Sequence, residues 1–531
     1  MSDLVAVRRA LVSVSDKRDL LPLARTLIEH GVEIISTGGT ATALIAQGIP
    51  VVSIEQLTGF PEIMDGRLKT LHPRVHGGLL GRRDSATHLA AMAQHEIRPI
   101  DLVCVNLYPF ESTIRRAGVT EAEAIENIDI GGPSMIRSAA KNFSHVCVVT
   151  SPDQYDLVCG ELRQHHGATS GRLRRSLAAT AFTRTAAYDS AISQWFDSSH
   201  EHDFSNTLTV NLVKVDELRY GENPHQRAAV YTRPGSREPS LVGAPLLHGK
   251  PLSYNNLLDA SAALELVEDL CEIVPQQSAC AIIKHTNPCG AALASTACEA
   301  FTHAYEGDPL AAYGSIVAFN CPIDEETARE MVAGERFLEV VIAESFSAPA
   351  LEALSARWKN VRLIALGPIR HCEDRPVSLR SVPGGVLVQD RDTLPLRAES
   401  LQHVAGPAPT SAVLADALFA FNIVKHLKSN AICIAHDQTL WGAGAGQMDR
   451  VASCRIAIEK SRGRLATAGS SGVVAASDAF FPFADGPQLL IDAGVRCVVH
   501  PGGSKRDQDT VDLCTKHGVT CLLTGSRHFR H

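Results

Sequence analysis

The fold of the first part of the chain is decided by residues 10–40, which read ALVSVSDKRDLLPLARTLIEHGVEIISTGGT. An apolar run at 10–14 is followed by an amphipathic stretch at 20–30 and a second apolar run at 32–36. Apolar runs that alternate with amphipathic stretches are typical of βαβ units. The rhythm returns at residues 102–107, so we predict a parallel α/β sheet.

Polar residues come directly after these apolar runs, in segments 13–17, 36–40 and 106–109. The carboxyl ends of parallel strands share one edge of a sheet, so these groups should gather at that edge. Segment 36–40 reads STGGT and lies between a strand and a helix, where hydroxyl and backbone N–H groups could hold a phosphate. An ordinary turn with a helix N-cap would use the same residues.

A basic loop adds charge to this predicted edge. Residues 67–78 read RLKTLHPRVHGG. Arg67 and Lys69 stand two residues apart, so they would project to the same side of an extended segment and could together bind an anion. The alternative is a loop whose charges are merely solvated.

A third segment, residues 128–142, places an acid and two glycines before a predicted helix. The acid is Asp129, and the helix would end at Lys141. With Tyr108 and Lys69, these residues would provide proton donors and acceptors beside a phosphate site. The alternative is a core helix with a capped start.

Composition excludes several classes of protein. The 531 residues are 45% hydrophobic and 20% charged, as in globular proteins, and the formal charge of -8 gives no global basic field for a nucleic acid or a membrane surface. We find no signal peptide and no 18-residue apolar run, so we expect no membrane span. The 14 cysteines form no C-x-x-C pair, which favours reduced thiols in the cytoplasm over zinc or disulfides.

A change in sequence character predicts a domain boundary near residue 205. A long helical pattern at 172–196 is followed by a polar stretch and then by a strand-like start at residue 207. We therefore predict a first domain over residues 1–205 and a second over 206–531.

The second domain contains two similar strand-loop-helix passages, around residues 279–301 and 431–458. They indicate a weak internal duplication, with halves at about 206–365 and 400–531. The segment between the halves is rich in Arg and Pro and would connect them.

The first of these passages ends its apolar run with K-H-T-N-P-C-G, residues 284–290. A regular strand would point Lys284 and His285 to opposite faces, so they can share a site only if the pleat breaks there. Pro288 and Gly290 make such a break plausible. The alternative is a surface lysine beside a histidine that bonds to the backbone.

Other polar segments of the second domain are not required by a core. Residues 219–226 read RYGENPHQ, Asn430 begins the second apolar run, and Gln447 and Arg450 follow a glycine loop. The aromatic segment 478–483 could stack on a heterocycle, and the terminal R-H-F-R-H could bind an anion.

A series of short blocks occurs in a fixed order: S-V-S-D-K, S-T-G-G-T, K-T-L-H-P, N-L-Y-P-F, I-D-I-G-G, A-A-K-N, R-Y-G-E-N-P-H-Q, K-H-T-N-P-C-G, S-N-A, G-A-G-Q, S-D-A-F-F-P-F and R-H-F-R-H. Over nearly its whole length the chain resembles the family of bifunctional purine biosynthesis proteins. In that family phosphoribosylaminoimidazolecarboxamide (AICAR) formyltransferase is joined to IMP cyclohydrolase.

The resemblance implies a methylglyoxal-synthase-like doubly wound parallel sheet in the first domain, followed by two cytidine-deaminase-like α/β subdomains. It also implies a homodimer with transformylase sites across its interface, and nucleotide and folate ligands. The cosubstrate would be 10-formyltetrahydrofolate, with no tightly bound cofactor; a requirement for a monovalent cation such as K⁺ stays open.

For formyl transfer, the resemblance implies that His285 acts as the base for a weakly nucleophilic amine. Lys284 would stabilise the oxyanion or protonate the leaving folate nitrogen, and Asn430 would orient the formyl oxygen. Positions that match nucleotide, base or pterin contacts of the family are Arg219, Tyr220, Asp308, Gln447, Arg450, Phe480, Pro482 and Arg527.

For ring closure, the resemblance implies that Lys69 meets the developing oxyanion, while Tyr108, Asp129 and Lys141 relay protons or water. The reacting groups lie in one molecule, which removes much of the barrier. Residues implied in phosphate and ribose binding are Ser15, Lys17, Thr37, Gly38, Gly39, Thr40, Arg67 and Thr70.

Two other functions would fit parts of this sequence. The first domain could be a regulatory module that only binds a phosphate ligand, but such a module would not need Lys69, Tyr108 and Lys141. The second could be a zinc deaminase, but its H-x-E and P-C-x-x-C ligands are missing, so we expect no catalytic metal. After Asp308 the chain reads PLAAYGS, where relatives commonly have serine and phenylalanine before the glycine, so contacts near Asp308 are expected to differ.

Overall fold

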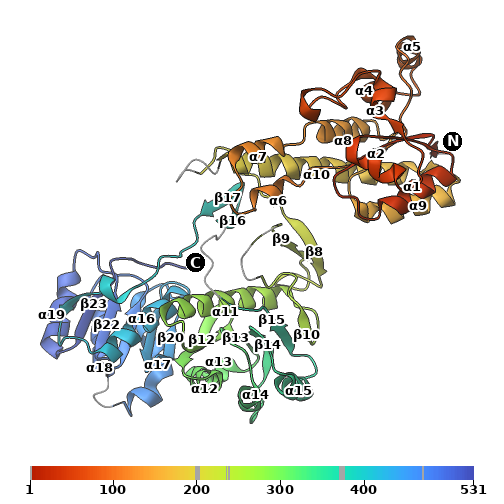
Figure 1. Cartoon of the computed structure of the whole chain (residues 1–531). Coiled ribbons are helices and arrows are strands. Elements are labelled where there is room, and N and C mark those ends of the chain that lie inside the picture. The colour runs from red at the N-terminus through yellow and green to blue at the C-terminus, as the bar shows by residue number, and fades with distance from the viewer. Residues whose placement is uncertain (1–2, 198–203, 235, 237–239, 370–376, 469–471) are drawn as a thin grey trace. The chain divides into compact units, whose positions relative to one another are not determined.

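The computed structural model describes residues 3–197, 204–234, 236, 240–369, 377–468 and 472–531 (Figure 1). The chain divides into two compact units, unit 1 at Met1–Asn211 and unit 2 at Leu212–His531. Among the described residues, no helix is both long and apolar enough to cross a membrane.

Unit 1 contains a five-stranded sheet in the order β4-β3-β2-β5-β6, with every pair parallel. The predicted parallel sheet is therefore confirmed. Chain order reverses beside β2, because the chain adds β3 and β4 on one side and β5 and β6 on the other. Its strands are β2 (Arg9–Val14), β3 (Glu33–Ser36), β4 (Val52–Ser53), β5 (Leu102–Asn106) and β6 (Cys147–Val149), and a separate pair is formed by β1 (Val5–Ala6) and β7 (Ala168–Thr169).

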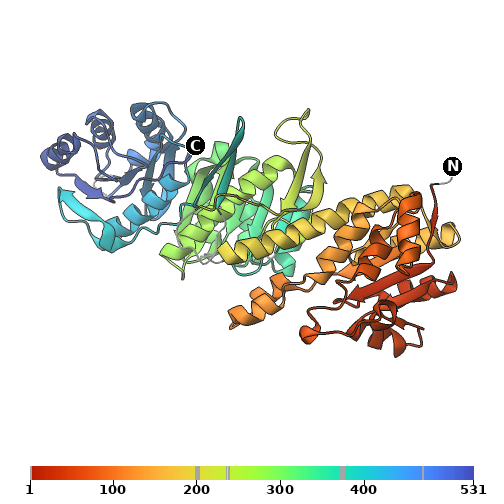
Figure 2. The same ribbon diagram turned by 90° about the horizontal axis from the view of Figure 1, so that it is seen from above.

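Helices of unit 1 form two groups: α1 packs against α9, and α8 packs against α4 and α10. Figure 2 shows the long α10 lying along the other elements of this unit. The buried strand residues, which include Leu11, Ile35 and Val103, form one core with both groups. The helices are α1 (Leu20–Glu29), α2 (Gly38–Ile45), α3 (Ile54–Thr58), α4 (Pro73–Leu80), α5 (Ala86–Gln94), α6 (Phe110–Ile114), α7 (Glu121–Glu126), α8 (Gly131–Lys141), α9 (Tyr155–Gln164) and α10 (Gly171–Asp197).

Unit 2 contains a twelve-stranded sheet in the order β10-β15-β14-β13-β11-β12-β20-β19-β21-β22-β23-β18. The order is the same when read outward from the central β12–β20 pair in either direction: a hairpin, three strands and an antiparallel edge strand. The weak repeat in the sequence thus corresponds to a repeated topology. The strands are β10 (Leu246–His248), β11 (Ser278–Lys284), β12 (Asn287–Ala294), β13 (Ser315–Phe319), β14 (Leu338–Ala343), β15 (Arg362–Ala365), β18 (Gln402–Ala405), β19 (Ile432–His436), β20 (Thr439–Gly444), β21 (Val474–Ser477), β22 (Cys497–His500) and β23 (Thr520–Leu523).

Both central hairpins allow a helix to approach closely. A Cβ atom on Gly290 would lie 2.0 Å from the carbonyl oxygen of Ala304 in α12, and one on Gly442 would lie 2.6 Å from that of Ala457 in α17. The two glycines occupy the same position after their turns, so each half uses glycine to seat a helix on its hairpin.

The helices of unit 2 cover both faces of this sheet. One apolar cluster lies beneath α11 and α16 and spans both halves, whereas the opposite face has a separate cluster for each half. The helices are α11 (Tyr254–Ile273), α12 (Ala297–Gly307), α13 (Pro309–Ala312), α14 (Glu325–Met331), α15 (Ala348–Arg357), α16 (Ser411–Lys425), α17 (Arg450–Leu465), α18 (Asp485–Asp492) and α19 (Asp507–His517).

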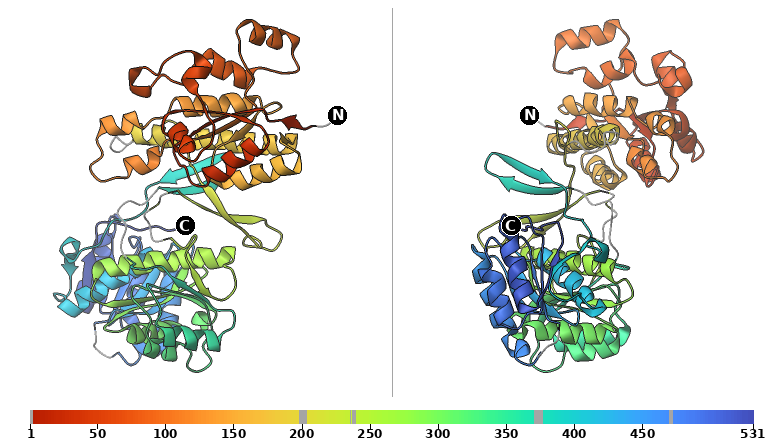
Figure 3. Two further views of the ribbon diagram at one scale, coloured as in Figure 1. Left: turned by 45° about the vertical axis from the view of Figure 1, so that its right-hand side comes forward. Right: turned by 90° about the vertical axis from the view of Figure 1, so that its left-hand side faces the viewer.

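Two further hairpins stand apart from the twelve-stranded sheet (Figure 3). They are β8 (Val213–Leu218) with β9 (Ala228–Thr232), and β16 (Ser378–Val382) with β17 (Gly385–Gln389). The second hairpin belongs to the predicted connecting segment, of which residues 370–376 lie outside the described part of the chain.

Candidate active sites

A cavity of about 680 Å³ lies at the carboxyl ends of the strands of unit 1. Its lining begins at the ends of β2, β3 and β5, beside the point where strand order reverses. Open α/β sheets bind their ligands at this kind of position. The cavity contains every residue predicted for the first site except Lys141: Ser15, Lys17, Thr37, Gly38, Gly39, Thr40, Arg67, Lys69, Thr70, Tyr108 and Asp129.

One wall of the cavity suits a phosphate. Thr37 precedes α2 but does not cap it; its hydroxyl lies 2.7 Å from the hydroxyl of Ser13 instead. The first backbone N–H groups of α2 therefore have no side-chain cap within the described chain and remain available to an anion. Asn106 shapes the neighbouring loop, because its Oδ1 accepts hydrogen bonds from the backbone N–H groups of Ser15 (2.6 Å) and Asp16 (2.9 Å).

Arg67 and Lys69 of the basic loop are both paired with carboxylates. Lys69 Nζ bonds to Glu62, and it is close to the start of α2, since a Cβ atom on Gly38 would lie 3.1 Å from that nitrogen. Arg67 pairs with Glu126 at 2.5 Å. A positive charge at a helix N-terminus is unfavourable unless an anion accompanies it. Glu62 neutralises Lys69 here, as an anionic ligand could do in its place.

The opposite wall presents the acid–base groups. Asp129 Oδ1 accepts a hydrogen bond from the backbone N–H of Gly132 (2.8 Å) at the start of α8. Burial raises the pKa of Asp129 despite this bond, so its carboxyl is suited to exchanging a proton. Its backbone N–H donates to the hydroxyl of Tyr188 (2.9 Å), which holds the segment in place. Tyr108 is half exposed at the cavity mouth.

Lys141 is the one residue predicted for this site that does not line the cavity. It is exposed at the last position of α8, whereas the cavity lies at the first turn of that helix. A rise of about 1.5 Å per residue separates the two ends by roughly 15 Å. Lys141 of this chain is therefore not part of the cavity.

Among the lining residues with polar side chains, four have no role predicted from the sequence: Ser13, Glu62, Asn106 and Glu126. Ser13 and Asn106 lie in segments that we did connect with the edge. No sequence motif marks Glu62 or Glu126 as a site residue. Glu126, for example, pairs with Arg67 across 59 residues of sequence.

In unit 2, Lys284 and His285 lie where β11 turns into β12. The pleat breaks there, as predicted, but through the two-residue turn His285–Thr286, whose φ values are 52° and 62°. Pro288 and Gly290 belong to β12 and lie on either side of a shift in its register with β11. Asp259 of α11 accepts a hydrogen bond from the backbone N–H of Thr286 (2.7 Å). Burial raises the pKa of Asp259.

The two side chains have different surroundings. Lys284 Nζ donates to the carbonyl oxygens of Tyr313 (2.8 Å) and Gly314 (3.3 Å), whereas His285 is exposed at the tip of the turn. The shared cavity around both residues stays a prediction.

A second loop lies beside this turn. Asn287, which follows the turn, accepts a hydrogen bond from the backbone N–H of Lys428 (3.0 Å), two residues before Asn430. The Asn430 amide donates to the carbonyl oxygen of Gln447 (2.9 Å) and accepts from Arg450 (2.7 Å).

Arg450 is itself buried and pairs with Asp478 at 2.5 Å. The structure therefore brings together Asn430, Gln447 and Arg450, with Arg450 supporting Asn430. A contact between Arg450 and a nucleotide stays a prediction.

The remaining predicted residues of unit 2 lie mostly at the surface. The Arg219 guanidinium stacks on Tyr220, and that of Arg527 stacks on Phe529. Phe480 and Pro482 are exposed. Asp308 caps α13 and pairs with Lys460.

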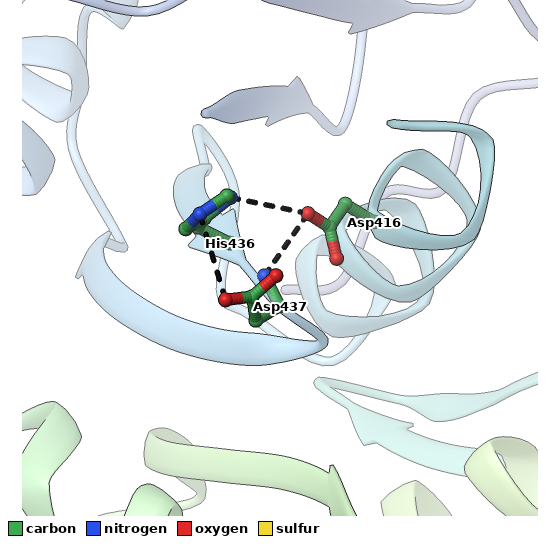
Figure 4. Close-up of side chains that lie close together, drawn as sticks. All are labelled: Asp416, His436 and Asp437. Atoms are coloured by element: carbon green, nitrogen blue, oxygen red, sulfur yellow. Dashed lines mark hydrogen bonds and ion pairs between the residues drawn. The ribbon is translucent and has the colours of Figure 1, made fainter. Parts of the chain in front are cut away.

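The other half of unit 2 has a turn of the same kind without the same chemistry (Figure 4). Asp437 and Gln438 have φ values of 48° and 49°, and Asp416 of α16 accepts hydrogen bonds from both backbone N–H groups. His436 and Asp437 take the places of Lys284 and His285. Asp416, His436 and Asp437 have ligand atoms within 4.8 Å of one another, the geometry of a candidate metal site among the described residues.

Comparisons with known proteins cover nearly the whole chain. The AICARFT/IMPCHase bienzyme family matches residues 139–460, and the MGS-like domain family matches residues 19–134. Proteins named bifunctional purine biosynthesis protein PurH are 47% identical in Halalkalibacterium halodurans, over 99% of this chain and 100% of the relative, and 48% identical in Rhodospirillum rubrum, over 99% of each. The relative of that name in Magnetococcus marinus is 47% identical over 99% of each chain.

Proposed function

The chain belongs to the AICARFT/IMPCHase bienzyme family, and we propose that its two reactions use separate sites, one in each unit. The protein is a bifunctional formyltransferase and IMP cyclohydrolase of purine biosynthesis. Its first unit is an MGS-like domain. The alternative of a purely regulatory first unit is not favoured.

We assign ring closure to the cavity of unit 1. One observation carries this assignment: the uncapped start of α2, Lys69 and the half-buried Asp129 line the same space of about 680 Å³. The carboxamide nitrogen of formylated AICAR attacks its formyl carbon, and a C–N bond forms. Lys69 stabilises the resulting oxyanion after it leaves Glu62, and the oxygen departs as water once protons have moved from nitrogen to oxygen. Asp129 and Tyr108 are the proposed proton carriers.

We assign formyl transfer to the turn of β11 and β12. His285 takes a proton from the substrate amine as it attacks the formyl carbon of the folate cosubstrate. Lys284 stabilises the oxyanion or protonates the departing folate nitrogen, and Asn430 orients the formyl oxygen. The hydrogen bond between Lys428 and Asn287 supports the assignment, because it joins the Asn430 loop to the hairpin.

A double dissociation tests both assignments. In the full chain, His285→Ala should stop formyl transfer and leave closure of formylated AICAR intact, while Lys69→Met should do the reverse. Both products are followed in one chromatographic assay. Loss of both activities in either well-folded variant contradicts separate sites.

Several finer features remain proposals: two deaminase-like subdomains, 10-formyltetrahydrofolate as the folate, a monovalent cation such as K⁺, and a homodimer. Isolated two-stranded hairpins are marginally stable alone. The separate hairpins of unit 2 expose apolar residues such as Val213 and Leu387, which supports cover by a second copy. A sedimentation mass of one chain would oppose the dimer. Free thiols throughout the described residues support the cytoplasm.

A further inference from the structure

The carboxyl-terminal segment of the chain lies against the loop that carries Asn430. The backbone N–H of Ser429 donates to the carbonyl oxygen of Arg530 (2.9 Å), and the backbone N–H of Arg530 donates to the hydroxyl of Ser429 (3.2 Å). Lys428 Nζ donates to the carbonyl oxygen of His531 (2.8 Å). The two residues that precede Asn430 are therefore held by the end of the chain.

The Arg530 side chain continues into a cluster of charged residues. One guanidinium nitrogen lies 3.1 Å from Nδ1 of His426, and another donates to Glu265 of α11 (3.1 Å). Nε2 of His426 lies 2.7 Å from a carboxylate oxygen of Asp269, and Lys425 Nζ lies 2.8 Å from the same oxygen. His426 is only 4% exposed, so this contact is sheltered from water.

Hydrogen-bond chemistry fixes the state of His426. Arginine has only donors, so Nδ1 of His426 must accept, and the ring proton sits on Nε2 and points at Asp269. Burial lowers the pKa of His426, in agreement with a neutral ring. Burial alone would raise the pKa of Asp269, but His426 and Lys425 hold it well below its ordinary value. A neutral imidazole thus links a carboxylate to a guanidinium.

Helix α11 supplies both sides of the proposed transfer site. Its Asp259 holds the turn of His285, while Glu265 and Asp269 hold Arg530 and His426. The distance between the proposed base and Asn430 therefore depends in part on this helix and on Arg530, beside the hydrogen bond between Lys428 and Asn287.

Resting on the proposed function, we propose that Arg530 is a positioning residue for formyl transfer. It fixes the loop 425–430 to α11 through His426 and Glu265, and so sets the place of Asn430 relative to His285. It does not touch the reacting atoms.

Arg530→Met in the full chain should lower kcat for formyl transfer roughly 10- to 100-fold, because small misplacements of reacting groups have effects of this size. KM for both substrates and the rate of ring closure should stay near wild type. Arg530→Lys keeps one donor and should recover part of kcat. The matched control is Arg506→Met, which removes an exposed arginine paired with Asp509 in the same unit.

Equal kcat values for Arg530→Met and Arg506→Met overturn the proposal, and so does an equal fall in both activities. Should Arg530→Met not fold, Arg530→Lys is compared with the control, and unchanged kcat overturns the proposal. Absence of formyl transfer in the wild type would instead refute the proposed function.

Discussion

The two central hairpins of unit 2 have nearly the same backbone and different side chains. Each has a two-residue turn with positive φ, a register irregularity two residues before the turn, and a helical aspartate that binds the turn's N–H groups. One turn carries Lys284 and His285, and the other carries His436 and Asp437. The comparison separates two contributions. The helical aspartate and the strand register shape each turn, whereas the side chains on the turn give it its chemistry.

The largest difference is expected at the first turn position. His285→Ala should lower kcat of formyl transfer about 100- to 10,000-fold, the usual contribution of a positioned base. Asp437→Ala, at the matching position of the other hairpin, should change it less than about twofold, since that turn carries no proposed reacting group. Steady-state assays with both substrates saturating measure this. Similar losses of kcat in the two variants would contradict the assignment of formyl transfer to the turn of His285.

The helical aspartates should separate shape from chemistry. Asp259→Ala and Asp416→Ala each leave turn N–H groups without an acceptor, so each should lower the free energy of unfolding by about 1–3 kcal/mol. Only Asp259→Ala should also lower kcat of formyl transfer, by roughly tenfold or more. Urea unfolding and the transfer assay on the same samples provide the two measurements. A kcat loss with Asp416→Ala would contradict the assigned roles.

A smaller effect should appear in the pH dependence of stability. Burial raises the pKa of Asp416 above its ordinary 3.8, so the folded state binds this proton more tightly than the unfolded state. The contribution of protonated Asp416 to the free energy of unfolding is complete below pH 3.8. It is lost as pH rises through the pKa of Asp416 in the folded state. The unfolding free energy of wild type, relative to Asp416→Asn, should therefore fall as pH rises above about 4.

Asp509→Asn, which removes an exposed carboxylate, is the control for that series. It should show no such trend against wild type. A difference that grows toward pH 7 for Asp416→Asn would mean that the carboxylate form is the one favoured by folding.

The smallest expected effect concerns metal. Both Asp416 oxygens already accept backbone N–H groups, so Zn²⁺ or Mg²⁺ should leave the melting temperature of the full protein unchanged. Calorimetric scans with chelator and with each ion test this. A rise in Tm that His436→Ala abolishes would show that the turn at Asp437 and Gln438 binds a cation.

The sequence was most informative where local pattern decides structure. Alternation of apolar and amphipathic stretches predicted the parallel sheet, and STGGT predicted the start of a helix beside it. Motif order led to the residues that line the cavity of unit 1.

The sequence did not reveal which distant residues come together in space. Lys141 was placed in the site because its motif follows Asp129, although α8 carries it to the far end. The pairing of Glu62 with Lys69 depends on how a loop closes. The turn at His285–Thr286 escaped detection because neither residue is a usual one for positive φ, and Asp259 stabilises it from a distant helix.

The continuous apolar layer beneath α11 and α16 restricts how this protein can evolve. The two halves of unit 2 repeat one strand order, yet neither half is a spare part, because both fill the same interior. Deleting the half without Lys284 and His285 would expose that interior to water. Packing alone is therefore a reason to keep the second half, independently of any reaction it performs.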